Sequence, residues 1–262
     1  AVLVFLCFFL SMFITNDVSL ITFVPFTVLI LTIIGQTKLM IYVIVLQTIA
    51  ANLGSMLTPV GNPQNLYLYS LSGMDISLFL KTMLPYTLLS GLMLLLALFL
   101  KPGEEVSLQA VFTETKAMAR RPLAAYTLLF LLCLGCVLRL IPWQAVLLIL
   151  LAVLFFFNRR LLLKADFGLL FTFVFFFLFI GNMGRIPAIV SFLRSVLSGH
   201  ELFLSIAASQ VISNVPAAIL LSGFTGNYLP LLVGVNIGGL GTLIASLASL
   251  ISYKQYLSLI HI

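Results

Sequence analysis

The sequence predicts an all-α, polytopic membrane protein built as an inverted repeat, in which each half holds a re-entrant helical hairpin and a broken transmembrane helix. Of the 262 residues, 62% are hydrophobic and only 8% are charged, whereas a soluble domain has about 25% charged residues. The apolar residues form runs long enough to cross a bilayer. Polar segments interrupt these runs at corresponding places in the two halves, which is typical of a transporter's binding site.

The first half, residues 1–100, begins with an apolar stretch over residues 1–31 that Thr15-Asn16-Asp17 interrupts. Each part of this stretch would form a helix of roughly 21 Å, too short for a hydrocarbon core of about 30 Å. Two interpretations follow. The stretch is either one tilted helix with an intramembrane aspartate or a re-entrant hairpin with the polar triplet at its tip.

A second interrupted run covers residues 38–69, where polar residues, glycine and proline lie between Thr58 and Asn65. Hydrocarbon cannot hydrogen-bond a free backbone group, so a broken helix at this depth must lie inside protein or beside water. We therefore predict a broken transmembrane helix over 38–69 and an unbroken one over 78–100. Residues 101–121 form the polar loop that links the two repeats.

The second half, residues 122–253, starts with spans over 123–140, 143–157 and 167–184, and residues 185–200 are expected to form a loop. The pattern of the first half then returns. A predicted hairpin over 200–224 has Ser213-Asn214 at its tip, and a predicted broken helix covers 228–253. We interpret the whole chain, 1–262, as one transmembrane domain that is truncated at both ends.

Lysine and arginine concentrate in the loops 101–121 and 158–166, which places both loops in the cytoplasm. Counting spans from these loops makes the first hairpin open from the cytoplasm and the second from outside. This is the inverted topology of many secondary transporters. The formal charge of +6 is the excess of lysine and arginine that keeps cytoplasmic loops on their side of the membrane, so we expect no nucleic-acid partner.

An alignment of the two halves is weak by identity but agrees with this topology. It pairs residues of similar chemistry: Asn52 with Asn236, Gly54 with Gly238, Thr58 with Thr242, Asn16 with Asn214, and Thr15 with Ser213.

The predicted site combines the two tips with the two helix breaks. A helix N-terminus carries about half a positive charge, so two converging tips attract an anion without lysine or arginine. The candidate substrate-binding residues are Thr15, Asn16, Asp17, Ser213, Asn214, Thr242 and Ser246. Unwound carbonyls and amide oxygens can hold a cation, and the candidate cation-binding residues are Asn16, Thr58, Gly61, Asn62, Asn65, Asn214, Asn236 and Ala245. Na⁺ or H⁺ is the expected coupling ion, with no other cofactor or metal.

Structural alternatives exist for these residues. An intramembrane carboxylate such as Asp17 indicates function by default, but Asp17 also suits an N-cap. Asn16 and Asn214 also suit hydrogen bonds that hold membrane helices together, and Gly234 and Gly238 form a GxxxG pattern that favours close helix packing.

These motifs resemble the ion transporter superfamily, which includes citrate transporters, divalent anion–sodium symporters, arsenite permeases and sodium/proton antiporters. The Ser/Thr-Asn tips, the stretch from Asn52 to Asn65 and the stretch from Gly234 to Ala248 carry the resemblance across nearly the whole chain. It implies that the hairpin tips bind an anion and that the tips and breaks bind the coupling cation. Asp17 departs from the Ser-Asn-Thr tips of dicarboxylate symporters, which leaves arsenite permease and Na⁺/H⁺ antiporter as alternatives.

The expected function is secondary active transport of a small anion, such as a di- or tricarboxylate, coupled to Na⁺ or H⁺ by alternating access. A channel or a structural membrane subunit is the alternative outside this class. The only histidines are His200 and His261, and no metal-binding motif is present, so we expect no enzyme. The expected surroundings are the lipid bilayer of the bacterial inner membrane, with a homodimer as one possible assembly.

Overall fold

The computed structural model describes residues 1–100, 120–164 and 167–260, and these residues form helices without a strand. Their α-helices are α1 (Val2–Leu10), α2 (Asn16–Ile33), α3 (Met40–Ser55), α4 (Pro63–Ser72), α5 (Ile76–Phe99), α6 (Arg120–Val137), α7 (Trp143–Leu163), α8 (Phe167–Met183), α9 (Pro187–Leu197), α10 (Glu201–Ile212), α11 (Asn214–Ser222), α12 (Tyr228–Ile237) and α13 (Leu247–Ile260). The predicted all-α class is confirmed. The predicted linker 101–121 lies outside the described residues, except for its last two positions.

Four helical segments of the described chain are long and apolar enough to cross a membrane: Asn16–Ile33, Thr37–Ser55, Ile76–Phe99 and Trp143–Leu163. Helices α8 and α9 together pass the same test but bend by 102° at the residues between them. The protein is therefore a polytopic membrane protein. The orientation of the two halves relative to the bilayer stays a prediction.

The chain forms two compact units, residues 1–108 with 175–262, and residues 109–174. In the smaller unit, α6 packs against α7. Helix α7 is kinked at Asn158, which has non-helical backbone angles, and its side-chain amide lies 3.5 Å from the hydroxyl of Tyr126. The helix continues through this kink to Leu163, so the predicted basic loop over 158–166 is wrong for residues 158–163.

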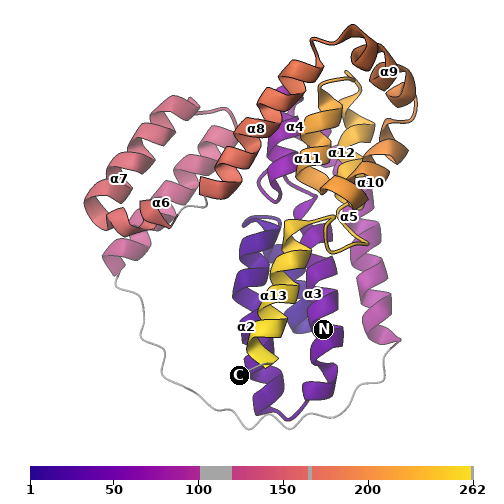
Figure 1. The fold of residues 1–262 in the computed structure, drawn as a ribbon. Coiled ribbons are helices and arrows are strands. Elements are labelled where there is room, and N and C mark those ends of the chain that lie inside the picture. Colours follow the sequence, from indigo (N-terminus) through magenta and orange to yellow (C-terminus); the bar gives the residue numbers. More distant parts are fainter. Residues whose placement is uncertain (101–119, 165–166, 261–262) are drawn as a thin grey trace. The chain divides into compact units, whose positions relative to one another are not determined.

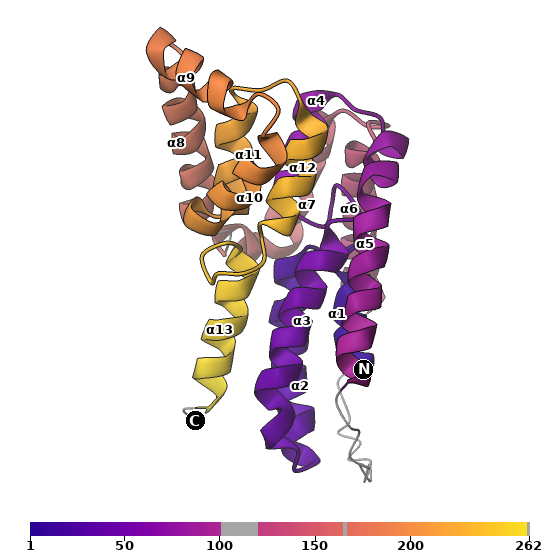
Figure 2. The same cartoon turned by 90° about the vertical axis from the view of Figure 1, so that its right-hand side faces the viewer.

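Within the larger unit, the helices on either side of the two breaks lie in two groups (Figures 1 and 2). Helices α1, α2, α3 and α13 form one group, and α4, α10, α11 and α12 form the other, whereas α5 runs beside both. We call residues 56–62, between α3 and α4, the first break, and residues 238–246, between α12 and α13, the second break. Both breaks lie where the two groups meet.

The chain reverses direction after α1 and after α10. The hydroxyl of Ser19 on α2 lies 3.4 Å from the carbonyl oxygen of Cys7 on α1. In a straight helix these residues would be about 18 Å apart, so residues 1–33 do not form one tilted helix. Helices α10 and α11 likewise pack against each other, and the chain turns between them at Ser213, which has a φ of +75°. We call α1–α2 the first hairpin and α10–α11 the second.

Glycines bring each hairpin close to a broken helix. A Cβ added to Gly54 on α3 would overlap the backbone oxygen of Phe8 on α1. A Cβ added to Gly238 would lie 2.8 Å from Ile206 Cα and from Ser209 Cβ on α10, and one added to Gly234 would overlap Ser205 Oγ on the same helix. Small residues that let helix backbones approach are typical of packing in membranes. Gly234 and Gly238 therefore allow α12 to pack closely against α10, as the GxxxG pattern predicts.

Residues 187–197 form a helix, α9, so the predicted loop over 185–200 is wrong for these residues. Pro187 occupies the first turn of α9, a position where its missing N–H costs no hydrogen bond. Proline at this place therefore ends the long apolar run of α8 and also starts a new, sharply turned helix. The loop prediction used only the first of these two effects.

A candidate site where two hairpin tips and two helix breaks meet

The first tip, Thr15-Asn16-Asp17, caps the N-terminus of α2. The hydroxyl of Thr15 accepts a hydrogen bond from the N–H of Val18 at 3.3 Å, and the side-chain oxygen of Asn16 accepts one from the N–H of Asp17 at 2.9 Å. The backbone N–H of Asn16 donates to the carbonyl of Gly61 in the first break at 3.0 Å. Asn16 is buried, and its tip is fixed against the first break.

The second tip, Ser213-Asn214-Val215, makes corresponding contacts at the N-terminus of α11. The side-chain oxygen of Asn214 accepts a hydrogen bond from the N–H of Val215 at 2.9 Å. The backbone N–H of Asn214 donates to the carbonyl of Ala245 in the second break, also at 2.9 Å. The hydroxyl of Ser213 lies 3.4 Å from the same carbonyl. The second tip is therefore fixed against the second break.

A threonine shapes each break. In the first, the hydroxyl of Thr58 donates to the carbonyl of Met12 and accepts from the N–H of Gly61. In the second, the hydroxyl of Thr242 donates to the carbonyl of Gln210 and accepts from the N–H of Ala245, both at 3.1 Å. Met12 and Gln210 each precede the asparagine of their tip by four residues.

These contacts follow the sequence alignment of the two halves. In both halves, the backbone N–H of the tip asparagine donates to a carbonyl of the break, and the hydroxyl of the threonine donates to a carbonyl of the hairpin. The same hydroxyl accepts from the N–H three residues later, and all these residues stand at paired positions. The side chains of Asn52 and Asn236 also both donate to the carbonyl four residues earlier. The two segments therefore share one local arrangement of hydrogen bonds.

Asn52, on α3, links the first tip to the second break. Its side-chain oxygen accepts hydrogen bonds from the amide of Asn16 at 3.1 Å and from the hydroxyl of Ser246 at 2.9 Å. Ser246 follows Ala245, whose carbonyl holds Asn214. The two tips thus belong to one hydrogen-bonded network, with Asn52 and the second break between their asparagines.

Asn236, near the end of α12, links the second half to the first break. Its side-chain amide donates to the oxygen of Asn65 at 2.6 Å. Its side-chain oxygen lies 3.3 Å from the amide nitrogen of Asn62 and 3.5 Å from that of Gln64. The contact of Asn62 with Asn236 joins the first break to the second half, just as the contact of Ser246 with Asn52 joins the second break to the first half.

Three buried oxygens near this network have no hydrogen-bond partner among the described residues: Asp17 Oδ1, Asn62 Oδ1 and Gln64 Oε1. A buried oxygen without a donor is costly unless a cation, a proton or water satisfies it. All three belong to the first half, on the first tip or at the start of α4. This part of the site can therefore accept a positive charge.

Three residues of this network were absent from the predicted site: Asn52, which accepts hydrogen bonds from Asn16 and Ser246, Gln64 and Gln210. Gln64 is 1% exposed and contacts Asn236, and Gln210 contacts the second break through its side chain and its backbone. Gln64 could have been chosen, because it lies inside the interrupted segment of the first repeat. Gln210 stands in an ordinary apolar helix pattern, which gave no such signal.

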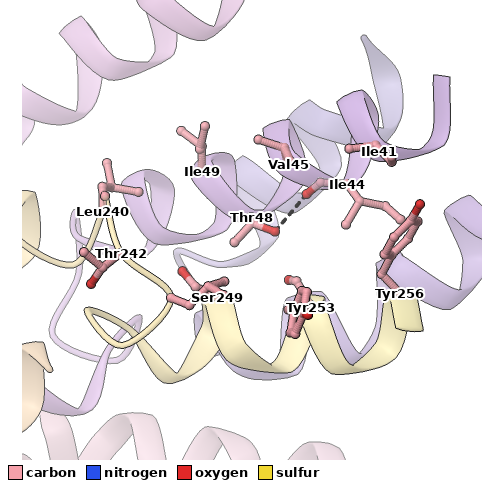
Figure 3. Close-up of a pocket in the computed structure, with 13 residues that line it drawn as sticks. Ile41, Ile44, Val45, Thr48, Ile49, Leu240, Thr242, Ser249, Tyr253 and Tyr256 are labelled. Carbon is pink, nitrogen blue, oxygen red and sulfur yellow. Dashed lines mark hydrogen bonds between the residues drawn. The ribbon is translucent and has the colours of Figure 1, made fainter. Parts of the chain in front are cut away.

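A cavity of about 550 Å³ lies between α3, α13 and the second break. Figure 3 shows Ile41, Val45 and Ile49 of α3 on one side, Tyr253 and Tyr256 of α13 on the other, and Thr242 at one end. Most of its lining is aliphatic or aromatic, and the polar side chains that line it carry only hydroxyl groups, without a charged residue or an amide. Thr242 is the only predicted site residue among the residues that line it.

Comparisons with known proteins agree with a membrane transporter. The sequence profile of the citrate transporter family matches residues 1–226. The chain is 38% identical over 256 residues to an uncharacterized transporter of Methanocaldococcus jannaschii and 34% identical over 263 residues to the inner membrane protein YbiR of Escherichia coli. The aligned parts cover 96% and 94% of this chain, but 69% and 66% of these two relatives.

No solved structure matches the chain. The family profile covers well over half of the residues, and the relative from M. jannaschii is itself named a transporter. These matches run through both hairpin tips and the first break. The chain therefore belongs to the citrate transporter family and is a transporter.

Proposed function

We propose that the protein is a secondary active transporter that moves a small anion, such as a di- or tricarboxylate, coupled to Na⁺ or H⁺ by alternating access. The observation that carries this proposal is the hydrogen-bonded network that joins two helix N-termini, at Asn16 and Asn214, to two helix breaks. Helix N-termini favour anions, and unwound segments within a transporter coordinate coupling cations. Both components lie within one set of contacts.

The anion is assigned to the tips and to the second break, through Thr15, Asn16, Ser213, Asn214, Thr242 and Ser246. Asn214 is the better placed of the two asparagines for a negative charge, because Val215 follows it, whereas the carboxylate of Asp17 follows Asn16. That carboxylate offsets the positive end of α2. We therefore place the negative charge of the cargo nearer to the N-terminus of α11.

The coupling cation is assigned to the first half, where Asp17, Asn62 and Gln64 have buried oxygens without donors among the described residues. Thr58, Gly61 and Asn65 shape this part of the site, and Asn236 completes it from the other half. The predicted contributions of Asn16, Asn214 and Ala245 to cation binding also remain a proposal. The carboxylate of Asp17, one oxygen of which is buried, also favours Na⁺/H⁺ antiport as a second candidate function, because intramembrane carboxylates serve as proton relays.

Alternating access needs two elements that move relative to each other. We propose two repeats of inverted topology for this purpose, residues 1–100 and 122–253, joined by the loop 101–121. The paired hydrogen bonds of the two halves support this arrangement. Transport of this kind breaks no covalent bond, so the protein is proposed not to be an enzyme. Its proposed location is the bacterial inner membrane, as the name of the E. coli relative says of that protein, and a homodimer stays a prediction.

The test is uptake of radiolabelled citrate, succinate or phosphate into proteoliposomes that contain the purified protein. We expect saturable accumulation above the external concentration when an inward Na⁺ or H⁺ gradient is imposed, and loss of accumulation when an ionophore removes that gradient. Flux that does not saturate and stops at equal concentrations would show a channel. Accumulation of Na⁺ driven by an outward H⁺ gradient, without anion uptake, would instead select the antiporter.

Replacement of Asp17 by asparagine is expected to uncouple transport from the cation gradient. The substitution keeps the size of the side chain but removes the charge that a coupling ion would neutralise. Uptake against a gradient should be lost, whereas exchange of labelled for unlabelled anion should persist. Asp75→Asn is the matched control, because Asp75 is an exposed N-cap of α5 and asparagine caps equally well. Unchanged accumulation in Asp17→Asn would remove Asp17 from the coupling site and leave it as an acidic residue in the first turn of α2, whose N-cap is Thr15.

A further inference from the structure

The side chain of Gln210, on α10, is used entirely by the backbone of the second break. Its amide nitrogen donates to the carbonyls of Gly238 and Leu240, both at 2.6 Å. Its oxygen accepts from the backbone N–H of Thr242 at 3.1 Å. A glutamine amide has two N–H groups and one carbonyl, so each of these groups meets a backbone group of the break.

These backbone groups belong to the segment where the hydrogen bonds of helix α12 end. Helix α12 finishes at Ile237, and free carbonyls that follow it within a membrane protein are costly. The backbone also passes very close to the glutamine. Gly241 has a φ of +119°, and a Cβ added there would lie 2.7 Å from Gln210 Oε1. Gln210 therefore takes over hydrogen bonds that a continuous helix would have made internally.

The first break is held differently. Met12 occupies the position of Gln210 in the first half, and its side chain has no amide group. There the side-chain amide nitrogen of Asn65, which lies on α4 after the break, is 3.4, 3.3 and 3.1 Å from the carbonyl oxygens of Ser55, Met56 and Thr58, which share its two N–H groups. The first break is thus held by the helix that follows it, whereas the second break is held by the hairpin that packs beside it. The two halves therefore have matching tips and threonines, but different side chains hold their breaks in shape.

We propose that Gln210 is a positioning residue that keeps the second break in the shape in which Ala245 and Ser246 meet the second tip and Asn52, and that joins this break to α10 as one body during transport. This inference rests on the proposed function, because it assigns the shape of the second break a part in binding. Gln210 acts through the backbone of residues 238–242 and touches no cargo. We call the three hydrogen bonds of the Gln210 side chain the clamp, and their effect on the break can be measured without knowledge of the cargo.

The first test is hydrogen–deuterium exchange on the purified Gln210→Met protein in lipid nanodiscs. Methionine keeps the length of the side chain and matches Met12, but it makes none of the three hydrogen bonds. We expect the amides of residues 239–246 to exchange about tenfold faster or more, because local opening governs exchange, with no change over residues 56–62. Gln144→Met, at an exposed position of α7, is the control and should leave the exchange of both breaks unaltered.

Two further variants keep the test decisive if Gln210→Met is poorly folded. Gln210→Asn retains an amide that is one methylene too short, and Gln210→Glu retains the acceptor for Thr242 but loses the donor to the two carbonyls. Both should also show faster exchange in residues 239–246. Unchanged exchange in all three variants, or equal acceleration throughout the chain, would overturn the clamp.

The second test separates positioning from stability. In proteoliposomes, Gln210→Met should raise the half-saturating concentrations of anion and cation about tenfold while lowering the maximal rate less, because a loosened site weakens binding before it slows later steps. A fall in maximal rate alone would contradict a positioning role. If the wild-type protein transports no tested solute, the proposed function fails, whereas the exchange measurement still decides the clamp.

Discussion

Replacement of Asn16 or Asn214 by alanine is expected to reduce gradient-driven anion uptake to background while the protein remains folded in the membrane. Each asparagine offers a side-chain amide at a helix N-terminus, next to a backbone N–H that is fixed to a break carbonyl. Loss of one helix cap costs about 1 kcal/mol, which a folded protein tolerates. Loss of a polar group that contacts a charged, desolvated ion costs about 1.5–3 kcal/mol, or roughly a factor of 10 to 100 in affinity.

The measurement compares initial uptake rates with the amount of protein that elutes as a single species in detergent. Asn182→Ala is the matched control, because Asn182 lies exposed on α8 within the described chain. This variant should transport at the wild-type rate. Normal uptake in both Asn16→Ala and Asn214→Ala would remove the tips from the site and leave them as contacts that hold helices together.

The positions of the helix breaks could be predicted from the sequence because their causes are local. The polar, glycine- and proline-containing segment from Thr58 to Asn65 was expected to interrupt a span, and the structure has its first break at residues 56–62 followed by Pro63 at the start of α4. Ser213-Asn214 was expected at a turn, and Ser213 has a positive φ. In each case the residue type itself disfavours an uninterrupted apolar helix.

The partners of the polar side chains could not be predicted in the same way. The contacts between Asn65 and Asn236 and between Asn52 and Ser246 join residues 171 and 194 positions apart. They depend on how the hairpins pack against α3 and α12, which glycines at positions 54 and 238 determine through close backbone approach. Local chemistry located the groups, whereas tertiary packing decided which of them meet.

The role of Gln210 could not be predicted by comparing the two halves of the sequence. Its counterpart in the alignment is Met12, so the repeat gave no reason to select it. The need for a clamp follows from the carbonyls that α12 leaves free after Ile237, and these are visible only once the path of the backbone is known. Similarly, helix α9 depends on the double effect of Pro187, which ends one helix and starts another.

Replacement of Asn236 by leucine is expected to cause the largest loss of stability among single changes in the site. Leucine has the same branching and number of side-chain heavy atoms as asparagine but leaves Asn62, Gln64 and Asn65 without their shared partner. Hydrogen bonds between membrane helices contribute ~0.6 kcal/mol each on average, and a buried polar group left unpaired costs ~1–3 kcal/mol. We therefore expect a loss of about 2–4 kcal/mol, measured by unfolding in mixed micelles, together with loss of uptake.

A double-mutant cycle tests whether this loss comes from the network. The change Asn65→Leu removes the partner that lies 2.6 Å from the Asn236 amide, so Asn65→Leu and Asn236→Leu together should cost less than the sum of the two single changes. Asn182→Leu, at the exposed position on α8, should leave the free energy of unfolding unchanged. Strictly additive losses would mean that Asn65 and Asn236 do not act as a pair, and the proposed connection between the second half and the first break would then have to be abandoned.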